Sequence, residues 1–137
     1  MPILESDAEI RSLLERARTI AVVGLSNNPE RDSHQIGYHL LKAGYRIIPV
    51  NPATKEVFGL RAFADLDSIG EQVDIVDIFR RPEAVPEVVD AAIRIGAGAI
   101  WMQPGTTHPT AAERASAAGL DVVSERCIML ELRRLIP

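Results

Sequence analysis

The sequence predicts an α/β protein with a Rossmann-like, doubly wound sheet of five parallel strands, ordered 3-2-1-4-5 and covered by helices on both faces. Three observations support this fold class. Short, continuously apolar segments recur along the chain, amphipathic helical segments separate them, and glycine follows several of these segments. Strands that are joined by crossover helices run parallel, and right-handed crossovers place helices on both faces of the sheet.

The first elements are a helix and a buried strand. Ser6 and Glu9 form a capping box, and apolar residues then recur at helical spacing through Ala17. Residues 19–24 are a short apolar segment that ends in glycine, which is typical of a buried strand. A polar loop follows at residues 25–32.

The middle of the chain predicts a second helix and a second strand. The helix begins at Ser33 and ends at Gly44, and residues 45–50 are the strand. Pro49 weakens the assignment near the end of this strand, because proline cannot donate a hydrogen bond to a neighbouring strand. Residues 54–68 are less regular, and we interpret them as a loop with a short extended piece near residues 57–58.

The remaining elements alternate between strand and helix. Strands are predicted at residues 73–79, 99–102 and 120–123. Pro82 begins one helix and Pro109 begins another, because proline is favoured at the first helical position. Gly96 and Gly119 end these two helices, and a last helix covers residues 128–135.

Length and composition indicate one ordinary globular domain, residues 1–137, with 47% hydrophobic and 25% charged residues. The net charge of −4 argues against a strongly basic surface for nucleic acid. Neither a membrane-spanning segment nor a signal peptide is recognised, because charged residues interrupt the apolar ones near the N-terminus. The single Cys127 excludes an internal disulfide, so we expect a cytoplasmic protein.

Loops that follow the strands of a parallel sheet gather at one edge, and we expect a ligand there, at the ends of strands one and four. The loop after the first strand begins with Gly24, Leu25 and Ser26. A helix N-terminus near Ser33 offers free N–H groups to a phosphate, and Arg31 adds a cation. The second and third glycines of the G-x-G-x-x-G fingerprint are missing, and a plain structural turn is the alternative interpretation.

The end of the second strand carries Asn51 and Pro52, with Lys55 close behind. An NAD-binding unit usually has an acidic residue at this position, which binds the ribose hydroxyls. A carboxylate would repel a phosphate on the ribose, whereas Asn51 and Lys55 would accept one. The adenosine of coenzyme A carries such a 3′-phosphate, although Asn-Pro also occurs in ordinary turns.

Phe79, Arg80 and Arg81 follow the third strand and precede a helix. Two cations at a helix N-terminus are unfavourable for the helix dipole unless an anion lies beside them, so these arginines favour a phosphate site. Two solvated surface arginines are the alternative.

The only tryptophan, Trp101, and the nearby Gln103 lie at the end of the fourth strand. We expect them at the mouth of the crevice, where Gln103 would reach the amides or phosphates of a ligand. Burial of Trp101 in the core is the alternative.

Five short segments carry a family resemblance: GLS (24–26), VNP (50–52), DIFR (77–80), WMQPG (101–105) and RC (126–127). Together, and in this order, they resemble the small stand-alone CoA-binding proteins. Those proteins are similar to the N-terminal CoA-binding domain of the succinyl-CoA synthetase α subunit and of ADP-forming acyl-CoA synthetases. The resemblance extends over almost the whole chain, and the set of motifs is far more specific than any one of them.

This resemblance implies that CoA or an acyl-CoA binds at the carboxyl edge of the sheet. Residues 24–26 and Ser33 would hold the pyrophosphate, and Asn51, Pro52 and Lys55 would lie near the 3′-phosphate. Residues 79–82 would follow the nucleotide, and residues 101–103 would lie near the pantetheine. The synthetases also need a ligase domain with a phosphorylated histidine and a domain for ATP, neither of which is recognised in this sequence. We therefore expect a carrier, a sensor or a partner of an enzyme, without catalytic residues of its own.

The other reactive residues give no stronger signal. His34, His39 and His108 lack metal-ligand spacing with a cysteine or a carboxylate, so no metal site is expected. Cys127 is either a buried structural thiol or a thiol that meets the end of CoA or a partner protein. An NAD(P)-dependent oxidoreductase and a regulator that binds another nucleotide remain the alternative functions, and a protein partner or a homo-oligomer stays open.

Overall fold

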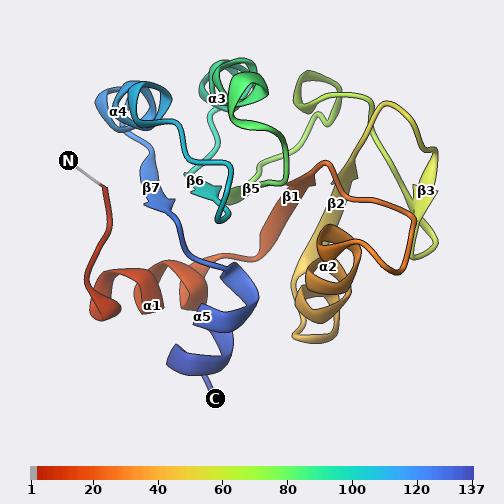
Figure 1. Cartoon of the computed structure of the whole chain (residues 1–137), viewed down its shortest axis with the longest axis horizontal. Coiled ribbons are helices and arrows are strands. Elements are labelled where there is room, and N and C mark those ends of the chain that lie inside the picture. The colour runs from red at the N-terminus through yellow and green to blue at the C-terminus, as the bar shows by residue number, and fades with distance from the viewer. Residues whose placement is uncertain (1–2) are drawn as a thin grey trace.

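Five parallel strands form the central sheet of the computed structural model, which describes residues 3–137 (Figure 1). In spatial order they are β2 (Arg46–Val50), β1 (Thr19–Val23), β5 (Ile75–Ile78), β6 (Ala99–Met102) and β7 (Asp121–Ser124). One face of the sheet packs against α1 (Asp7–Arg16), α2 (Asp32–Lys42) and α5 (Ile128–Leu135). The opposite face packs against α3 (Val85–Arg94) and α4 (Pro109–Ala117). The predicted fold class, a doubly wound parallel sheet with helices on both faces, is therefore confirmed.

The order of the strands differs from the predicted 3-2-1-4-5. The third of the five strands, β5, pairs with β1 and β6, so the order in chain numbering is 2-1-3-4-5. Pro49 gives a physical reason, because its carbonyl oxygen accepts from Phe63 N on the outer side of β2. The N–H and C=O groups of any one residue in a strand point to the same side, and successive residues alternate. Because the C=O of Pro49 faces outward, the position of its missing N–H also lies on the outer side of β2. An inner position for β2 would lose a ladder hydrogen bond.

The segment between β2 and β5 holds no crossover helix of ordinary length. It contains a small antiparallel hairpin of β3 (Glu56–Val57) and β4 (Leu60–Arg61), followed by the 3₁₀ turn η1 (Leu66–Ser68). The extended piece predicted near residues 57–58 is the first strand of this hairpin. Phe63 then forms a parallel bridge with Val50 of β2. At the other edge of the sheet, Ile3 forms a parallel bridge with Val122 of β7.

Most of the predicted element boundaries agree with the structure. The capping box at Ser6 and Glu9 is present at the start of α1. His108 caps α4, since its Nδ1 accepts from the amide of Ala111 at 3.1 Å. Pro82 begins the short 3₁₀ turn η2 (Pro82–Ala84), and α3 follows directly from it. None of the helices in residues 3–137 is long and apolar enough to cross a membrane.

Candidate functional site

A cleft of about 830 Å³ opens at the carboxyl ends of β1 and β5. These two strands are neighbours at the point where the crossovers reverse direction, since β1 leads to β2 on one side and β5 leads to β6 on the other. Ligands of open α/β sheets bind at such a switch point. The crevice was predicted at strands one and four, and the revised strand order moves it to strands one and three. The cleft is lined by Gly24, Ser26, Glu30, Arg31, Asp32, Ser33, Asn51, Pro52, Phe79, Arg80, Arg81, Pro82, Gly105 and Thr106.

Gly24 allows the ends of β1 and β5 to lie very close together. It has φ +90°, and a Cβ placed on it would lie 2.3 Å from the carbonyl oxygen of Phe79. Its own amide donates to Val50 O of β2 at 2.8 Å. A side chain at this position would therefore separate the strands that form the floor of the cleft.

The loop after Gly24 is fastened to the start of α2. Ser26 N donates to the buried Ser33 Oγ at 3.0 Å, and His34 Nδ1 lies 2.8 Å from Ser26 O. Ser26 Oγ in turn accepts from Asn28 N at 3.0 Å. These contacts hold the loop beside the N-terminus of α2, where the first amides of a helix have no intrahelical acceptor. The cleft thus contains a fixed cradle of the kind that binds phosphate.

Asn51 lines the cleft, but its side chain is already engaged. Its Nδ2 donates to Leu25 O at 3.0 Å, and its Oδ1 accepts from Ala53 N at 2.8 Å. Asn51 therefore ties the end of β2 to the loop that follows β1. The structure gives this residue a positioning role, which the sequence did not reveal.

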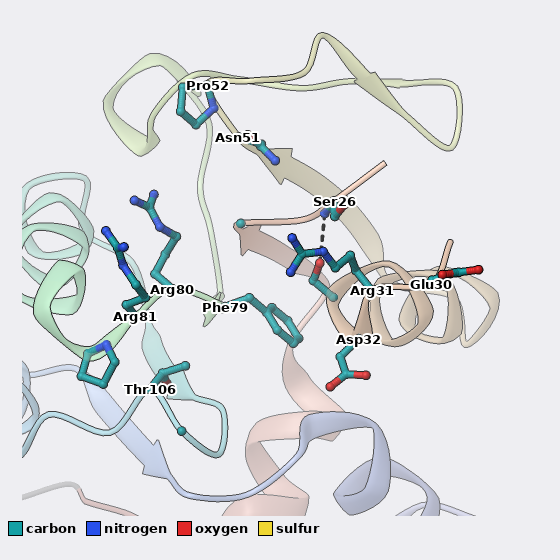
Figure 2. Close-up of a pocket in the computed structure, with 14 residues that line it drawn as sticks. Ser26, Glu30, Arg31, Asp32, Asn51, Pro52, Phe79, Arg80, Arg81 and Thr106 are labelled. Atoms are coloured by element: carbon teal, nitrogen blue, oxygen red, sulfur yellow. Dashed lines mark hydrogen bonds between the residues drawn. The ribbon is translucent and has the colours of Figure 1, made fainter. Parts of the chain in front are cut away.

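Three arginines surround the cleft from two sides. Arg31 reaches inward from the start of α2, and Arg80 and Arg81 rise from the end of β5 opposite it (Figure 2). Arg80 forms no salt bridge among the described residues, and Arg81 lies 3.9 Å from Glu83 with both side chains largely exposed. Glu30 and Asp32 place two carboxylates on the α2 side. The walls at the end of β5 therefore carry the excess of positive charge, where an anion would be stabilised.

Nine of the thirteen predicted site residues line the cleft. They are Gly24, Ser26, Arg31, Ser33, Asn51, Pro52, Phe79, Arg80 and Arg81. The other four lie elsewhere. Leu25 is buried, and Gly37 of α2 lies against it so closely that a Cβ there would be 2.9 Å from Leu25 Cδ1. Lys55 is exposed on the loop before β3 and does not line the cleft.

Trp101 and Gln103 do not lie at the mouth of the crevice, contrary to the prediction. The Trp101 side chain is completely buried, and its Nε1 donates to Arg126 O at 2.7 Å. Gln103 is also buried, and its Oε1 accepts from Ile128 N in the first turn of α5 at 3.1 Å. Both side chains therefore hold the connection between β7 and α5, because their polar atoms bond to the backbone of Arg126 and Ile128.

Five further residues line the cleft; of these, Pro82 belongs to the segment 79–82 that the resemblance places along the nucleotide and Gly105 follows the predicted Gln103, whereas Glu30, Asp32 and Thr106 were not predicted. Glu30 and Asp32 flank Arg31, Pro82 follows Arg81, and Gly105 and Thr106 come from the loop after β6. Thr106 is buried and donates through Oγ1 to Gln103 O at 2.8 Å. Gly105, which is part of the WMQPG segment, was the available signal for this loop. The two carboxylates carried no signal, since an anion site is not expected to include them.

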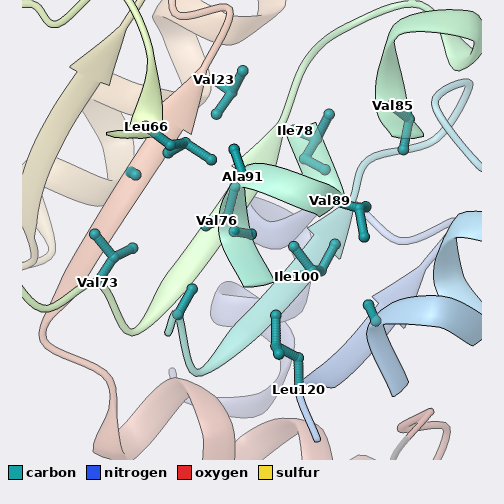
Figure 3. Close-up of a cluster of buried hydrophobic side chains, with 14 of the residues drawn as sticks. Val23, Leu66, Val73, Val76, Ile78, Val85, Val89, Ala91, Ile100 and Leu120 are labelled. Carbon is teal, nitrogen blue, oxygen red and sulfur yellow. The ribbon is translucent and has the colours of Figure 1, made fainter. Parts of the chain in front are cut away.

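A smaller pocket of about 220 Å³ adjoins the cleft, with Pro52 and Arg80 lining both. Its apolar wall includes Val23, Leu66 and Ala91, which belong to the buried cluster between the sheet and α3 (Figure 3). Its polar lining includes the carboxylates of Asp65, Asp67 and Glu87. The pocket therefore combines an apolar surface with several hydrogen-bond acceptors.

The remaining reactive groups lie outside the cleft. Asp77 on β5 is completely buried, its carboxyl oxygens have no hydrogen-bond partner among the described residues, and burial raises its pKa well above the usual range. Cys127 is half-buried at the N-cap of α5. Within residues 3–137, no three His, Cys, Asp or Glu side chains are grouped so as to hold a metal ion.

Comparison with known proteins gives a consistent result. The sequence model of a family described as "CoA binding domain" matches residues 18–133. Protein YneT of Bacillus subtilis, which is described as uncharacterized, is 40% identical over 123 residues, covering 90% of this chain and 91% of that protein. A hypothetical protein from Pyrococcus horikoshii has a solved structure that superposes with a TM-score of 0.95 and 38% identity, over 100% of this chain and 97% of that one.

A larger protein contains a region with a similar fold. An acetyl-coenzyme A synthetase from Ca. Korarchaeum cryptofilum matches with a TM-score of 0.70 and 25% identity. The match covers 78% of this chain and 26% of the synthetase chain. These findings confirm the resemblance that the five sequence segments indicated.

Proposed function

We propose a function from one premise: the chain belongs to the family of CoA-binding domains. In this proposal, CoA or an acyl-CoA binds in the cleft at the carboxyl ends of β1 and β5. The protein then acts as a binding module, a carrier or a sensor in the cytoplasm. The observation that carries the proposal is the cleft itself, where Arg80 and Arg81 face the fixed loop and the N-terminus of α2. Such a pairing of cations with free backbone amides suits a ligand with separate phosphate groups.

The chemistry of the lining supports one orientation of the nucleotide. The pyrophosphate would lie beside Ser26 and Ser33, where the amides of the α2 N-terminus are free to donate. The 3′-phosphate would lie between Pro52 and the two arginines at the end of β5. Adenine would enter the smaller pocket, where apolar contacts suit its ring and the carboxylates of Asp65 and Glu87 can accept from its amino group.

We assign no reaction to the cleft. No histidine or cysteine lines it within the described part of the chain, and the hydroxyl of Thr106 donates to a backbone carbonyl. An activated nucleophile needs a neighbouring base, and among the described residues the hydroxyls of Ser26, Ser33 and Thr106 bond only to backbone groups. Binding without chemistry is therefore the function that these residues support best.

Isothermal titration calorimetry with CoA, dephospho-CoA and NAD tests the proposal. CoA should bind most tightly, and dephospho-CoA should bind about ten-fold or more weakly, because the 3′-phosphate loses its charge-assisted contacts. NAD should bind weakly, because Asn51 stands where an NAD-binding unit has an acid and both polar atoms of its side chain are engaged. Tighter binding of NAD than of CoA would favour the alternative, an NAD(P)-dependent oxidoreductase.

A further inference from the structure

A groove of about 400 Å³ runs between α2 and α5, which pack against the same face of the sheet (Figure 1). Tyr38 of α2 is 50% exposed, Leu130 of α5 is 54% exposed, and both line this groove. They are two of the three large hydrophobic side chains that are exposed in residues 3–137, and the half-buried Met129 also lines the groove. Exposed apolar side chains that gather in one place are typical of a surface that another molecule covers.

The charged side chains along the groove differ in sign from one end to the other. Both helices begin at the carboxyl edge of the sheet, because each follows a strand, so they run in the same direction. Asp32 lies at the first position of α2. At the opposite end, Arg133 of α5 reaches across to α2, where its Nη2 lies 3.5 Å from Nδ1 of His39. Lys42, whose Nζ lies 6.0 Å from the centre of the Tyr38 ring, adds a cation at that end.

The two charges that line the groove are free to meet a second molecule. Neither Asp32 nor Arg133 forms a salt bridge within residues 3–137. Gln35, which also lines the groove, is engaged, because its Nε2 donates to Pro29 O at 3.2 Å. An occupant that presents a cation to Asp32, an acid to Arg133 and an apolar surface between them would therefore be stabilised.

A second copy of this chain presents these groups. The interface of a two-fold dimer pairs one surface with itself, so that surface must be complementary to itself. If the α2 helices of the two copies ran parallel, both acids would gather at one end of the interface and all the cations at the other, which is unfavourable. If they run antiparallel, Asp32 of each copy faces the end at which Arg133 and Lys42 of the other copy lie. The charges therefore select the antiparallel arrangement, which the dipoles of the two helices also favour.

We propose that a second copy of this chain covers the groove, with the α2 helices of the two copies antiparallel and Asp32 of each copy beside Arg133 of the other. Tyr38 and Leu130 of both copies are then removed from water. The helices α2 and α5 have 11 and 8 residues and extend about 16 and 12 Å. A surface of this size is smaller than the roughly 800 Å² that each partner buries in a standard interface. The dimer is therefore weak, with a dissociation constant in the micromolar range or above.

Analytical ultracentrifugation of the ligand-free protein tests the surface. From low micromolar to millimolar concentration, the average mass of the wild type should rise from that of one chain toward that of two. Leu130→Asn should raise the dissociation constant of the dimer about ten-fold or more, because each dimer buries two copies of this side chain. Ile3→Asn, at a side chain that is 42% exposed on another surface, should leave it unchanged. A wild type that stays monomeric, or a dimer that Leu130→Asn leaves intact, would overturn the inference.

Exchange of the charges tests the arrangement. Asp32→Arg should weaken the dimer about ten-fold or more, because cations then face each other, and Arg133→Glu should weaken it because acids do. An equimolar mixture of the two variants should associate like wild type, since each contact again joins a cation and an acid. Asp32→Asn and Arg133→Gln, which remove the charges without reversing them, should each weaken the dimer by a smaller factor. Urea-induced unfolding shows which variants are folded, and a mixture of folded variants that stays monomeric would contradict the antiparallel arrangement.

The dimer also changes the cleft, and this consequence alone rests on the proposed function. Asp32 lines both the groove and the cleft, so Arg133 of the second copy adds a cation on the side where Glu30 and Asp32 carry carboxylates. Saturating CoA should therefore strengthen the dimer in the same sedimentation experiment, because a ligand that binds the dimer more tightly shifts the equilibrium toward it. Failure of CoA to bind in calorimetry would reject the proposed function and leave the dimer to the ligand-free measurements. Binding of CoA without any gain in dimer would reject this contribution of Arg133 only.

Discussion

The Cα of Gly24 lies against the carbonyl oxygen of Phe79, so closely that a Cβ on residue 24 would stand 2.3 Å from this oxygen. This contact joins the ends of the two central strands at the floor of the cleft. It requires both the positive φ of Gly24 and the absence of a side chain there. The glycine at the end of the first predicted strand is thus explained by packing between strands.

Replacing this glycine should be costly. Gly24→Ala should lower the free energy of unfolding by more than about 2 kcal/mol, because it adds backbone strain and a collision with Phe79 O. Urea-induced unfolding measures the loss. Gly59→Ala is the matched control, since Gly59 also has a positive φ but nothing lies within 4 Å of its added Cβ. The same loss in both variants would show that strain alone, and no contact with Phe79, explains the glycine.

The arginines at the end of β5 should account for a large part of the affinity for CoA. We expect Arg80→Ala or Arg81→Ala to weaken binding about ten-fold or more, which is the contribution of one charge-assisted hydrogen bond. Calorimetry with CoA measures the change. Arg46→Ala should leave binding unaltered, because Arg46 forms a salt bridge with Glu71 away from the cleft. If both cleft variants bind CoA normally, the loop after β1 and the N-terminus of α2 alone bind its phosphates.

Gln103 should matter for stability and not for the ligand. Gln103→Met should destabilise the fold by about 1–3 kcal/mol, because the amide of Ile128 would lose its buried acceptor. The dissociation constant for CoA, measured well below the unfolding transition, should stay within about two-fold of wild type. Glu113→Met is the control for stability, because Glu113 is exposed and its side chain forms no hydrogen bond or salt bridge among the described residues. A large loss of affinity without a loss of stability would restore Gln103 to the binding site.

Asp77 should make the protein less stable as the pH rises. Burial raises its pKa, so the folded state keeps this proton at pH values at which the unfolded chain has released it. Its contribution to stability is therefore complete below the unfolded pKa and is lost as the pH rises through the folded pKa. Asp77→Asn should gain stability relative to wild type across this interval, by about 1.4 kcal/mol for each unit of raised pKa.

Chemical denaturation of wild type and Asp77→Asn at several pH values measures this trend. Asp67→Asn is a control of opposite sign, because the hydrogen bond from Arg94 lowers the pKa of Asp67. The stability that Asp67 contributes is present at pH values above the pKa of Asp67 in the unfolded chain. It is lost as the pH falls through the pKa of Asp67 in the folded protein. A difference between wild type and Asp77→Asn that does not change with pH would mean that Asp77 finds a partner in solution.

The sequence predicted the elements well because their signals are local. The capping box at Ser6 and the prolines at positions 82 and 109 act within a few residues of themselves. Strand order depends on pairing between distant segments, and the common Rossmann order was the wrong choice. Pro49 held the necessary information, since a strand with a missing N–H is favoured at an edge.

The site was predicted through its backbone positions more than through its side chains. Gly24, Ser33 and Arg80 lie at the cleft because loops after parallel strands gather at one edge. Whether a polar side chain points into the cleft or bonds to its own chain is not encoded locally. Asn51 and Gln103 contact Leu25 and Ile128, which are about 25 residues away in each case, and only the folded structure shows these partners.

The pairing of both outer strands has a consequence for self-association. Phe63 occupies part of the outer edge of β2, and Ile3 occupies part of the outer edge of β7. An exposed strand edge is a template to which another chain can add a strand, and such addition leads to aggregation. Here short irregular segments of the same chain use some of the backbone groups at each edge, and Pro49 removes one further donor. Two copies of this protein would therefore associate through side chains of their helices and loops rather than by extending a common sheet.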